Sequence, residues 1–140
     1  MTNQEITLVI EDLIKLSGGK HIKTPPPTDS LIESYQKDIG FLFSDEYKFF
    51  LKNASTIFYG TKDPLIITQD KSSRSELSNA IFEGRRIGLP NDWLPICEDN
   101  GDYYCIIPDG TVRFWTSNGS SDEKWPNLGS WIRDVWMSQG

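Results

Sequence analysis

Residues 88–119, GLPNDWLPICEDNGDYYCIIPDGTVRFWTSNG, decide the fold of this chain. Aromatic and β-branched runs, which favour strands, alternate here with Asn-Gly and Pro-Asp-Gly sequences, which favour tight turns. Two strands joined by so short a turn form a hairpin, and two hairpins that share a strand form a sheet. We therefore predict the centre of a sheet, with strands at residues 93–97, 103–107 and 111–116 and turns at 99–102 and 108–110.

Helical patterns flank these hairpins along the chain. Apolar residues recur at intervals of three and four, which is typical of a helix that packs on a core. Helices are predicted at residues 2–17, 29–39, 45–54, 72–84 and 127–137. A further hairpin is predicted at residues 56–60 and 65–68, and residues 120–126 are predicted to form an acidic, polar loop.

This order of elements predicts the fold class. Short connections between strands favour an antiparallel arrangement, and helices separated from the strands favour an α+β fold. We expect a mostly antiparallel sheet of about five or six strands, with helices packed mainly on one face. The 140 residues fit one domain spanning residues 1–140.

The helix starts are predicted from capping residues. A Ser or Thr before a helix accepts a hydrogen bond from the first turn, and a Glu three residues later returns one. Gly40 is predicted to end the second helix, because glycine readily takes the left-handed conformation. The predicted starts are at Thr2 with Glu5, Ser30 with Glu33, Ser44, and Ser73 with Glu76.

Composition and charge limit the function. No apolar run approaches the roughly 20 residues of a membrane span, and the N-terminus lacks a signal-peptide pattern, which predicts a cytoplasmic protein without membrane contact. The formal net charge of −6 argues against direct nucleic-acid binding, because phosphates require neutralisation by Lys and Arg. A basic protein partner suits this charge.

The acidic residues concentrate around the hairpins. Between residues 91 and 123 seven acidic residues stand against Arg113 alone, whereas acids and bases nearly balance before residue 91. The preference of turns for Asp accounts for the same pattern equally well. As candidate partner-binding residues we take Glu98, Asp99, Asp102, Asp109, Asp122 and Glu123.

A search for catalytic and metal-binding motifs is mostly negative. The single histidine, His21, excludes a two-histidine metal motif and disfavours a Ser-His-Asp triad. No phosphate-binding loop, dinucleotide fingerprint or nucleophile elbow occurs. Glu98, Asp99 and Asp102 offer carboxylates for Ca²⁺ or acid–base chemistry, but they lack EF-hand spacing and suit a solvated turn. We therefore predict a binding protein without catalytic residues, metal or cofactor.

Two cysteines lie on neighbouring predicted strands. Cys97 and Cys105 are placed where they can face each other across the hairpin. In a cytoplasmic protein, free buried thiols are the better expectation, because that compartment keeps thiols reduced.

The sequence also resembles a known family, the SUKH superfamily of Smi/Knr-type proteins. The resemblance covers roughly residues 28–137 and is carried by residues 87–115 and by the aromatic helix at 131–136. Residues 95–105, PICEDNGDYYC, fit the first strand pair of that family, and residues 112–115, VRFW, fit its next strand. Glu33 and residues 41–51 fit its N-terminal part, and residues 130–132 fit its last helix.

Membership implies an α+β fold and a bacterial immunity protein. Proteins of this kind bind a cognate toxin, often a basic nuclease of a polymorphic or contact-dependent system, and an acidic surface would steer such a toxin. The resemblance carries no binding residues over by motif. A regulatory or scaffolding module without a toxin partner is the alternative.

Overall fold

The computed structural model describes the backbone of residues 3–138 and the side chains of residues 5–118 and 121–138. Within these residues the chain forms an α+β fold around one antiparallel four-stranded sheet, with the strands in sequence order. The strands are β1 (Leu94–Asp99), β2 (Asp102–Ile106), β3 (Val112–Thr116) and β4 (Gly119–Trp125). The predicted fold class is therefore confirmed, but the sheet has fewer strands than predicted.

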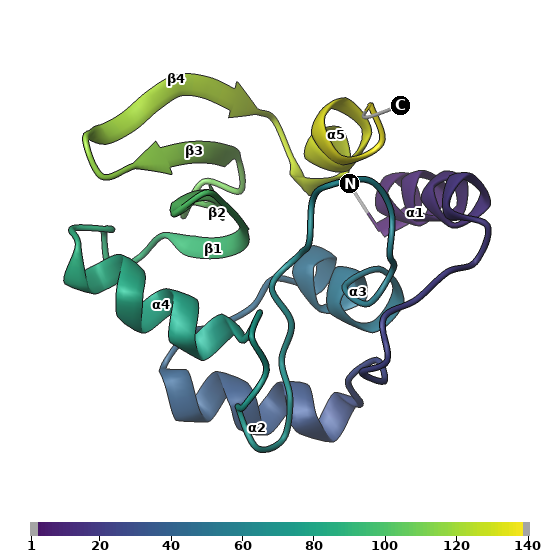
Figure 1. Ribbon diagram of the computed structural model, residues 1–140, viewed down its shortest axis with the longest axis horizontal. Helices are drawn as coiled ribbons and strands as arrows, with labels where there is room; N and C mark the ends of the chain where they lie inside the picture. The colour runs from purple at the N-terminus through teal and green to yellow at the C-terminus, as the bar shows by residue number, and fades with distance from the viewer. Residues whose placement is uncertain (1–2, 139–140) are drawn as a thin grey trace.

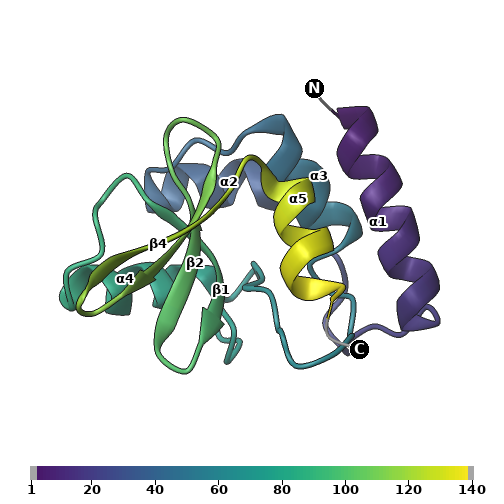
Figure 2. The same cartoon turned by 90° about the horizontal axis from the view of Figure 1, so that it is seen from above.

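The described part of the chain also forms five helices. They are α1 (Asn3–Ser17), α2 (Asp29–Ile39), α3 (Asp45–Asn53), α4 (Leu77–Arg86) and α5 (Leu128–Trp131), and the last continues into a π-helical turn, η1 (Ile132–Trp136). The sheet and α4 form one half of the molecule, and α1, α3 and α5 gather in the other half (Figures 1 and 2).

Helices pack against both faces of the sheet, which corrects the expectation of one covered face. Neighbouring side chains of a strand point to opposite faces, so Tyr103 and Tyr104 of β2 mark the two sides. The ring of Tyr104 lies 5.4 Å from that of Trp131 in α5. On the other side, Tyr103 lines a hollow together with Ala80 and Glu83 of α4.

The fourth strand lies where a polar loop was predicted, so that prediction was wrong. Lys124 pairs with Arg113, and Trp125 pairs with Val112. The ring of Trp125 also lies 5.7 Å from that of Tyr104. An edge strand has unpaired backbone on its outer side and commonly carries charged residues there. The polar residues of this segment therefore form an edge strand, and Trp125 is the residue that packs its side chain against the sheet.

The hairpin predicted at residues 56–60 and 65–68 is absent from the described structure. These segments make isolated bridges instead, between His21 and Ile57, Pro64 and Cys97, and Ile66 and Glu76. The amide of Leu65 donates to the carbonyl of Ile96 over 2.8 Å. Each segment therefore meets a partner far away in the chain, which local pattern does not reveal.

Two of the predicted helix starts need correction. Thr28, not Ser30, caps α2, and its hydroxyl accepts from the Leu31 amide at 3.1 Å. Helix α4 begins at Leu77, later than predicted, so Ser73 does not cap it. The cap of α3 by Ser44 is confirmed, as is the end of α2 at Gly40, which has φ 68°. The predicted cap Thr2 lies outside the described residues.

The core joins the two halves of the molecule and is rich in aromatic residues. The fully buried aromatic side chains are Tyr35, Tyr47, Phe50, Trp131 and Trp136. Both cysteines are free and buried, as predicted. Cys97 pairs with Tyr104 and therefore points to the face opposite Cys105, so the two thiols do not face each other.

Candidate functional site

A groove of about 940 Å³ runs between residues 24–28, the first turns of α2 and residues 67–70. Leu31 and Ile67 give it apolar surface, and Thr68 and Asp70 give it polar groups. Both polar groups are already engaged within the protein. The Thr68 hydroxyl bonds Glu76, and the Asp70 carboxylate accepts from the hydroxyl of Ser72 at 2.8 Å. These hydrogen bonds with Ser72 hold the pKa of Asp70 below its usual value.

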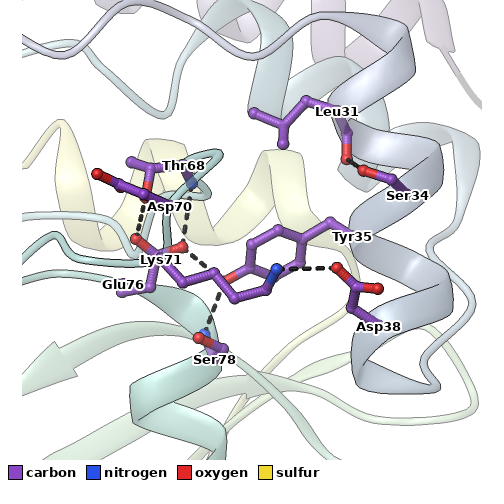
Figure 3. A network of polar contacts seen from close by, with 9 residues as sticks. All are labelled: Leu31, Ser34, Tyr35, Asp38, Thr68, Asp70, Lys71, Glu76 and Ser78. Carbon is purple, nitrogen blue, oxygen red and sulfur yellow. Dashed lines mark hydrogen bonds and ion pairs between the residues drawn. The ribbon is translucent and has the colours of Figure 1, made fainter.

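A buried carboxylate, that of Glu76, accepts a hydrogen bond from Thr68, which lines this groove (Figure 3). Glu76 stands at the position before α4 and is 1% exposed. One oxygen accepts from the hydroxyl of Tyr35 at 2.6 Å and from the amide of Thr68 at 3.0 Å. The other accepts from the hydroxyl of Thr68 and from the amide of Ser73 at 3.3 Å. A buried carboxylate is tolerated only when hydrogen bonds replace its water, and these four bonds do so.

Tyr35 extends the network into α2 (Figure 3). Its hydroxyl accepts from the amide of Ser78 at 2.9 Å while it donates to Glu76. Burial, and then the hydrogen bond to Glu76, raises the Tyr35 pKa far above its usual value, so the hydroxyl remains a donor. The ammonium of Lys71 lies 5.0 Å from the centre of the Tyr35 ring and bonds Asp38 at 2.8 Å.

The network joins α2, the loop before α4 and α4 itself. Both oxygens of Glu76 are occupied by donors of the protein, so the carboxylate does not face a substrate as a free base. Its arrangement fits a structural connection between elements. The sequence shows Glu76 only as a capping residue, and no local pattern indicates its burial.

The candidate acidic residues are distributed over both ends and both faces of the sheet. Successive hairpins turn at opposite ends, so the 99–102 turn and the 107–111 turn lie far from each other along the strands. Asp99 and Asp102 are paired residues at one end, whereas Asp109 lies in the turn at the other. The structure therefore brings together Asp99 and Asp102, but separates both from Asp109.

Glu98 and Asp99 are neighbours in the chain but point to different faces. Glu98 lines a hollow of about 320 Å³ that also contains Arg74 and Arg86. The carboxylate of Asp99 lies 3.6 Å from the ammonium of Lys62. Glu76 and Glu83 line the same hollow, and Arg86 pairs with Glu83, so Glu98 has charges of both signs around it, whereas Asp99 has one cation beside it.

The other candidate acids occupy β4 and the second turn. Asp122 and Glu123 are exposed on the edge strand β4. Burial, and then the negative charges of Asp99 and Glu123, raise the pKa of Tyr104 to about 12. In the second turn, the Asp109 carboxylate accepts from the amide of Thr111 at 2.9 Å and from its hydroxyl at 2.7 Å. These bonds lower the Asp109 pKa.

Most of these carboxylates are available to a partner. In the described part of the chain, no ion pair within the protein involves Glu98, Asp102, Asp109, Asp122 or Glu123. Charges that are not neutralised in an ion pair can act at a distance on a charged partner.

The described residues bring together no group of three or more His, Cys, Asp or Glu that could hold a metal ion. His21 lies outside any such arrangement, with Nδ1 3.1 Å from the hydroxyl of Thr56. Among the described residues, no helix is long and apolar enough to cross a membrane.

Comparison with known proteins decides the family. The model of the SMI1-KNR4 cell-wall family, SUKH_5, matches residues 6–137. The chain belongs to the SUKH superfamily. The SUKH assignment agrees with the resemblance of residues 28–137 noted in the sequence and extends it through α1.

A solved structure is similar to this SUKH chain over nearly its whole length. It is the crystal structure of a protein from Pseudomonas syringae pv. tomato, 29% identical, with a TM-score of 0.83. The similarity covers 94% of this chain and 98% of that one. Comparison with curated proteins finds no match.

Proposed function

We propose that this SUKH protein is an immunity protein that binds and neutralises a cognate bacterial toxin. The observation that carries the proposal is the family match over residues 6–137. The toxin is a basic, nuclease-type domain of a polymorphic or contact-dependent system. The immunity protein acts in the cytoplasm as a binding protein, without catalysis, cofactor, membrane contact or direct contact with nucleic acid.

The charge of the chain supports a basic partner. The net charge is −6, and the acids of the hairpins and β4 are mostly free of ion pairs in the described structure. A negative surface accelerates the approach of a positive partner, and it can occupy a site that otherwise receives phosphate. The partner-binding residues proposed for this attraction are Glu98, Asp99, Asp102, Asp109, Asp122 and Glu123.

Growth rescue tests the proposed function. The toxin domain encoded beside this chain's gene is produced from an inducible promoter, with and without the chain. The chain should restore growth against its own toxin and fail against an unrelated toxin of the same class. Continued growth arrest with a soluble, folded chain would refute the proposal.

A charge reversal tests the part assigned to the acids. Asp99→Lys together with Asp102→Lys should slow association with the toxin. Thermal stability should fall only modestly, because Asp99 has one ion pair, with Lys62, and partly exposed turn charges contribute little to folding. An unchanged association rate would show that these two acids do not belong to the partner-binding surface.

The description of the matching family favours one second candidate. It refers to the cell wall, which suits a regulatory or scaffolding module. Such a module should associate with several cellular proteins and should not protect against a neighbouring toxin.

A further inference from the structure

An exposed leucine is held in a fixed position between α2 and α3. Leu42 is 85% exposed, more than any other large apolar side chain among the described residues. The backbone on both sides of it is bound to Gln36, which is buried. The Phe41 amide donates to the Gln36 carbonyl at 3.2 Å, and the Phe43 amide donates to its side-chain oxygen at 2.7 Å. These two hydrogen bonds to Gln36 hold the backbone around Leu42 in place, with the Leu42 side chain exposed.

Leu42 forms one wall of a hollow of about 240 Å³. Phe41, Leu94, Ile106 and Ile107 supply further apolar surface from β1, β2 and the linker. The hollow is smaller than the roughly 300–1,000 Å³ of pockets that hold drug-sized ligands. Its size and apolar walls suit a single long side chain of a protein partner.

The charges at this hollow are acidic. Glu46 and Asp92 line it, and no Lys or Arg is among its lining residues. Asp109 stands between two further lining residues, Pro108 and Gly110. Glu46 is half-buried, forms no ion pair with a described residue, and accepts a long bond of 3.4 Å from the Leu128 amide. A carboxylate that has lost part of its water gains most from a cation supplied by a partner.

Hydrogen bonds within the protein hold two walls of the hollow in place. Asp109 holds the β2–β3 turn through its two bonds to Thr111, and Ser44 caps the start of α3 through the Tyr47 amide. A surface that is ordered in advance loses little conformational entropy on binding.

We propose that this hollow anchors the basic partner, with an Arg or Lys side chain of the toxin lying in it. The aliphatic stem packs on Leu42, and the charged head lies beside Glu46 and Asp92. Long basic side chains combine apolar and charged contact in this way. The inference rests on the proposed function and adds the position of the contact, at the end of the sheet that carries Asp109.

Another exposed apolar side chain fits a basic partner less well. Phe82 on α4 is 66% exposed, but the hollow beside it is lined by Arg85 and Arg86. Like charges facing each other oppose association.

Dissociation rates test the anchor. The probe is the toxin domain identified by growth rescue, with its catalytic residue removed, immobilised for surface plasmon resonance. Leu42→Ala and Asp92→Lys should each raise the dissociation rate about tenfold or more, because anchors of an interface act mainly on dissociation. Melting temperatures should remain those of the wild type, because both side chains are exposed.

Matched controls separate the anchor from general effects. Leu8→Ala removes another exposed leucine, on α1, and should leave both rates unchanged. Glu11→Lys reverses an exposed acid of α1, outside the proposed partner-binding residues, and should slow association without changing dissociation. A dissociation rate of the Leu42→Ala variant equal to that of the wild type would contradict the proposed anchor, while the proposed immunity function would be unaffected. A wild-type chain that does not bind the toxin would overturn both.

Discussion

At the scale of single residues, Glu76 is the least expected feature of this protein. A carboxylate 1% exposed, with four hydrogen bonds and a tyrosine from another helix, connects segments that are distant in the chain. Removing such a group leaves its buried donors without partners, and each unsatisfied donor costs more than a hydrogen bond usually contributes.

Glu76→Ala should therefore lower the free energy of unfolding by about 2–4 kcal/mol. Tyr35 and Thr68 lose their acceptor in this variant. Urea denaturation followed by tryptophan fluorescence measures the change. The control is Glu83→Ala, because Glu83 is an exposed acid of α4 in a surface ion pair with Arg86, and its loss should change stability by less than about 0.5 kcal/mol. Equal stability of the two variants would contradict the structural role of the network.

The cysteines give a second test at this scale. Burial raises the Cys97 pKa to about 12, and burial also raises the pKa of Cys105. The thiolate is the reactive form, so both thiols should stay unmodified by a thiol reagent at pH 8 in the folded protein and should react promptly in denaturant. Fast modification of the native protein would show that one thiol is accessible.

At the scale of elements, the central hairpins and most helices were predictable because their signals are local. The turns at Asn100-Gly101 and Asp109-Gly110 and the apolar stripe of the last helix specify their own structure. Strand β4 and the bridges of residues 57–66 depend on partners elsewhere, so their own residues do not reveal them. The sequence also did not reveal that Thr28, and not the predicted Ser30, caps α2, because both residue types suit that position.

The predicted cap of α2, Ser30, and the observed cap, Thr28, provide a matched pair of variants. Thr28→Ala should lower the free energy of unfolding by about 1 kcal/mol, because the Leu31 amide loses its side-chain acceptor. Ser30→Ala should change it by less than about 0.5 kcal/mol, because Ser30 lies inside the exposed first turn. Both are measured by chemical denaturation. A larger loss at Ser30 would contradict the observed start of the helix.

Trp115 tests the packing of the sheet against the turn after α4. It is 5% exposed and its ring stacks on that of Tyr103 at 6.4 Å. Trp115→Ala should lower the free energy of unfolding by about 3–5 kcal/mol or prevent folding, as removal of a buried tryptophan does. A loss below about 1 kcal/mol in thermal or chemical denaturation would show that this face of the sheet is not part of the core.

At the scale of the whole molecule, the sequence predicted an acidic protein but not how its charge is arranged. The acids between residues 91 and 123 form one block in the chain, yet the hairpins place them at both ends and on both faces of the sheet. Leu42 was not singled out, because a single leucine in a linker has no distinguishing pattern. Only the fold places it beside Glu46 and Asp92.

Charge spread over the molecule should act on the approach of the toxin. The association rate, followed by stopped-flow fluorescence, should fall about tenfold or more between about 0.05 M and 0.5 M salt, because salt screens charges separated by more than a Debye length. The dissociation rate should change much less. An association rate that does not depend on salt would show that electrostatic attraction does not accelerate the approach of the toxin.

The most direct test of the central claim is a calorimetric titration of the purified chain with the inactivated toxin domain encoded beside its gene. We predict a one-to-one complex with Kd at or below about 10⁻⁸ M. A titration without binding heat at several temperatures, with both proteins folded at concentrations of about 10⁻⁵ M, would contradict it.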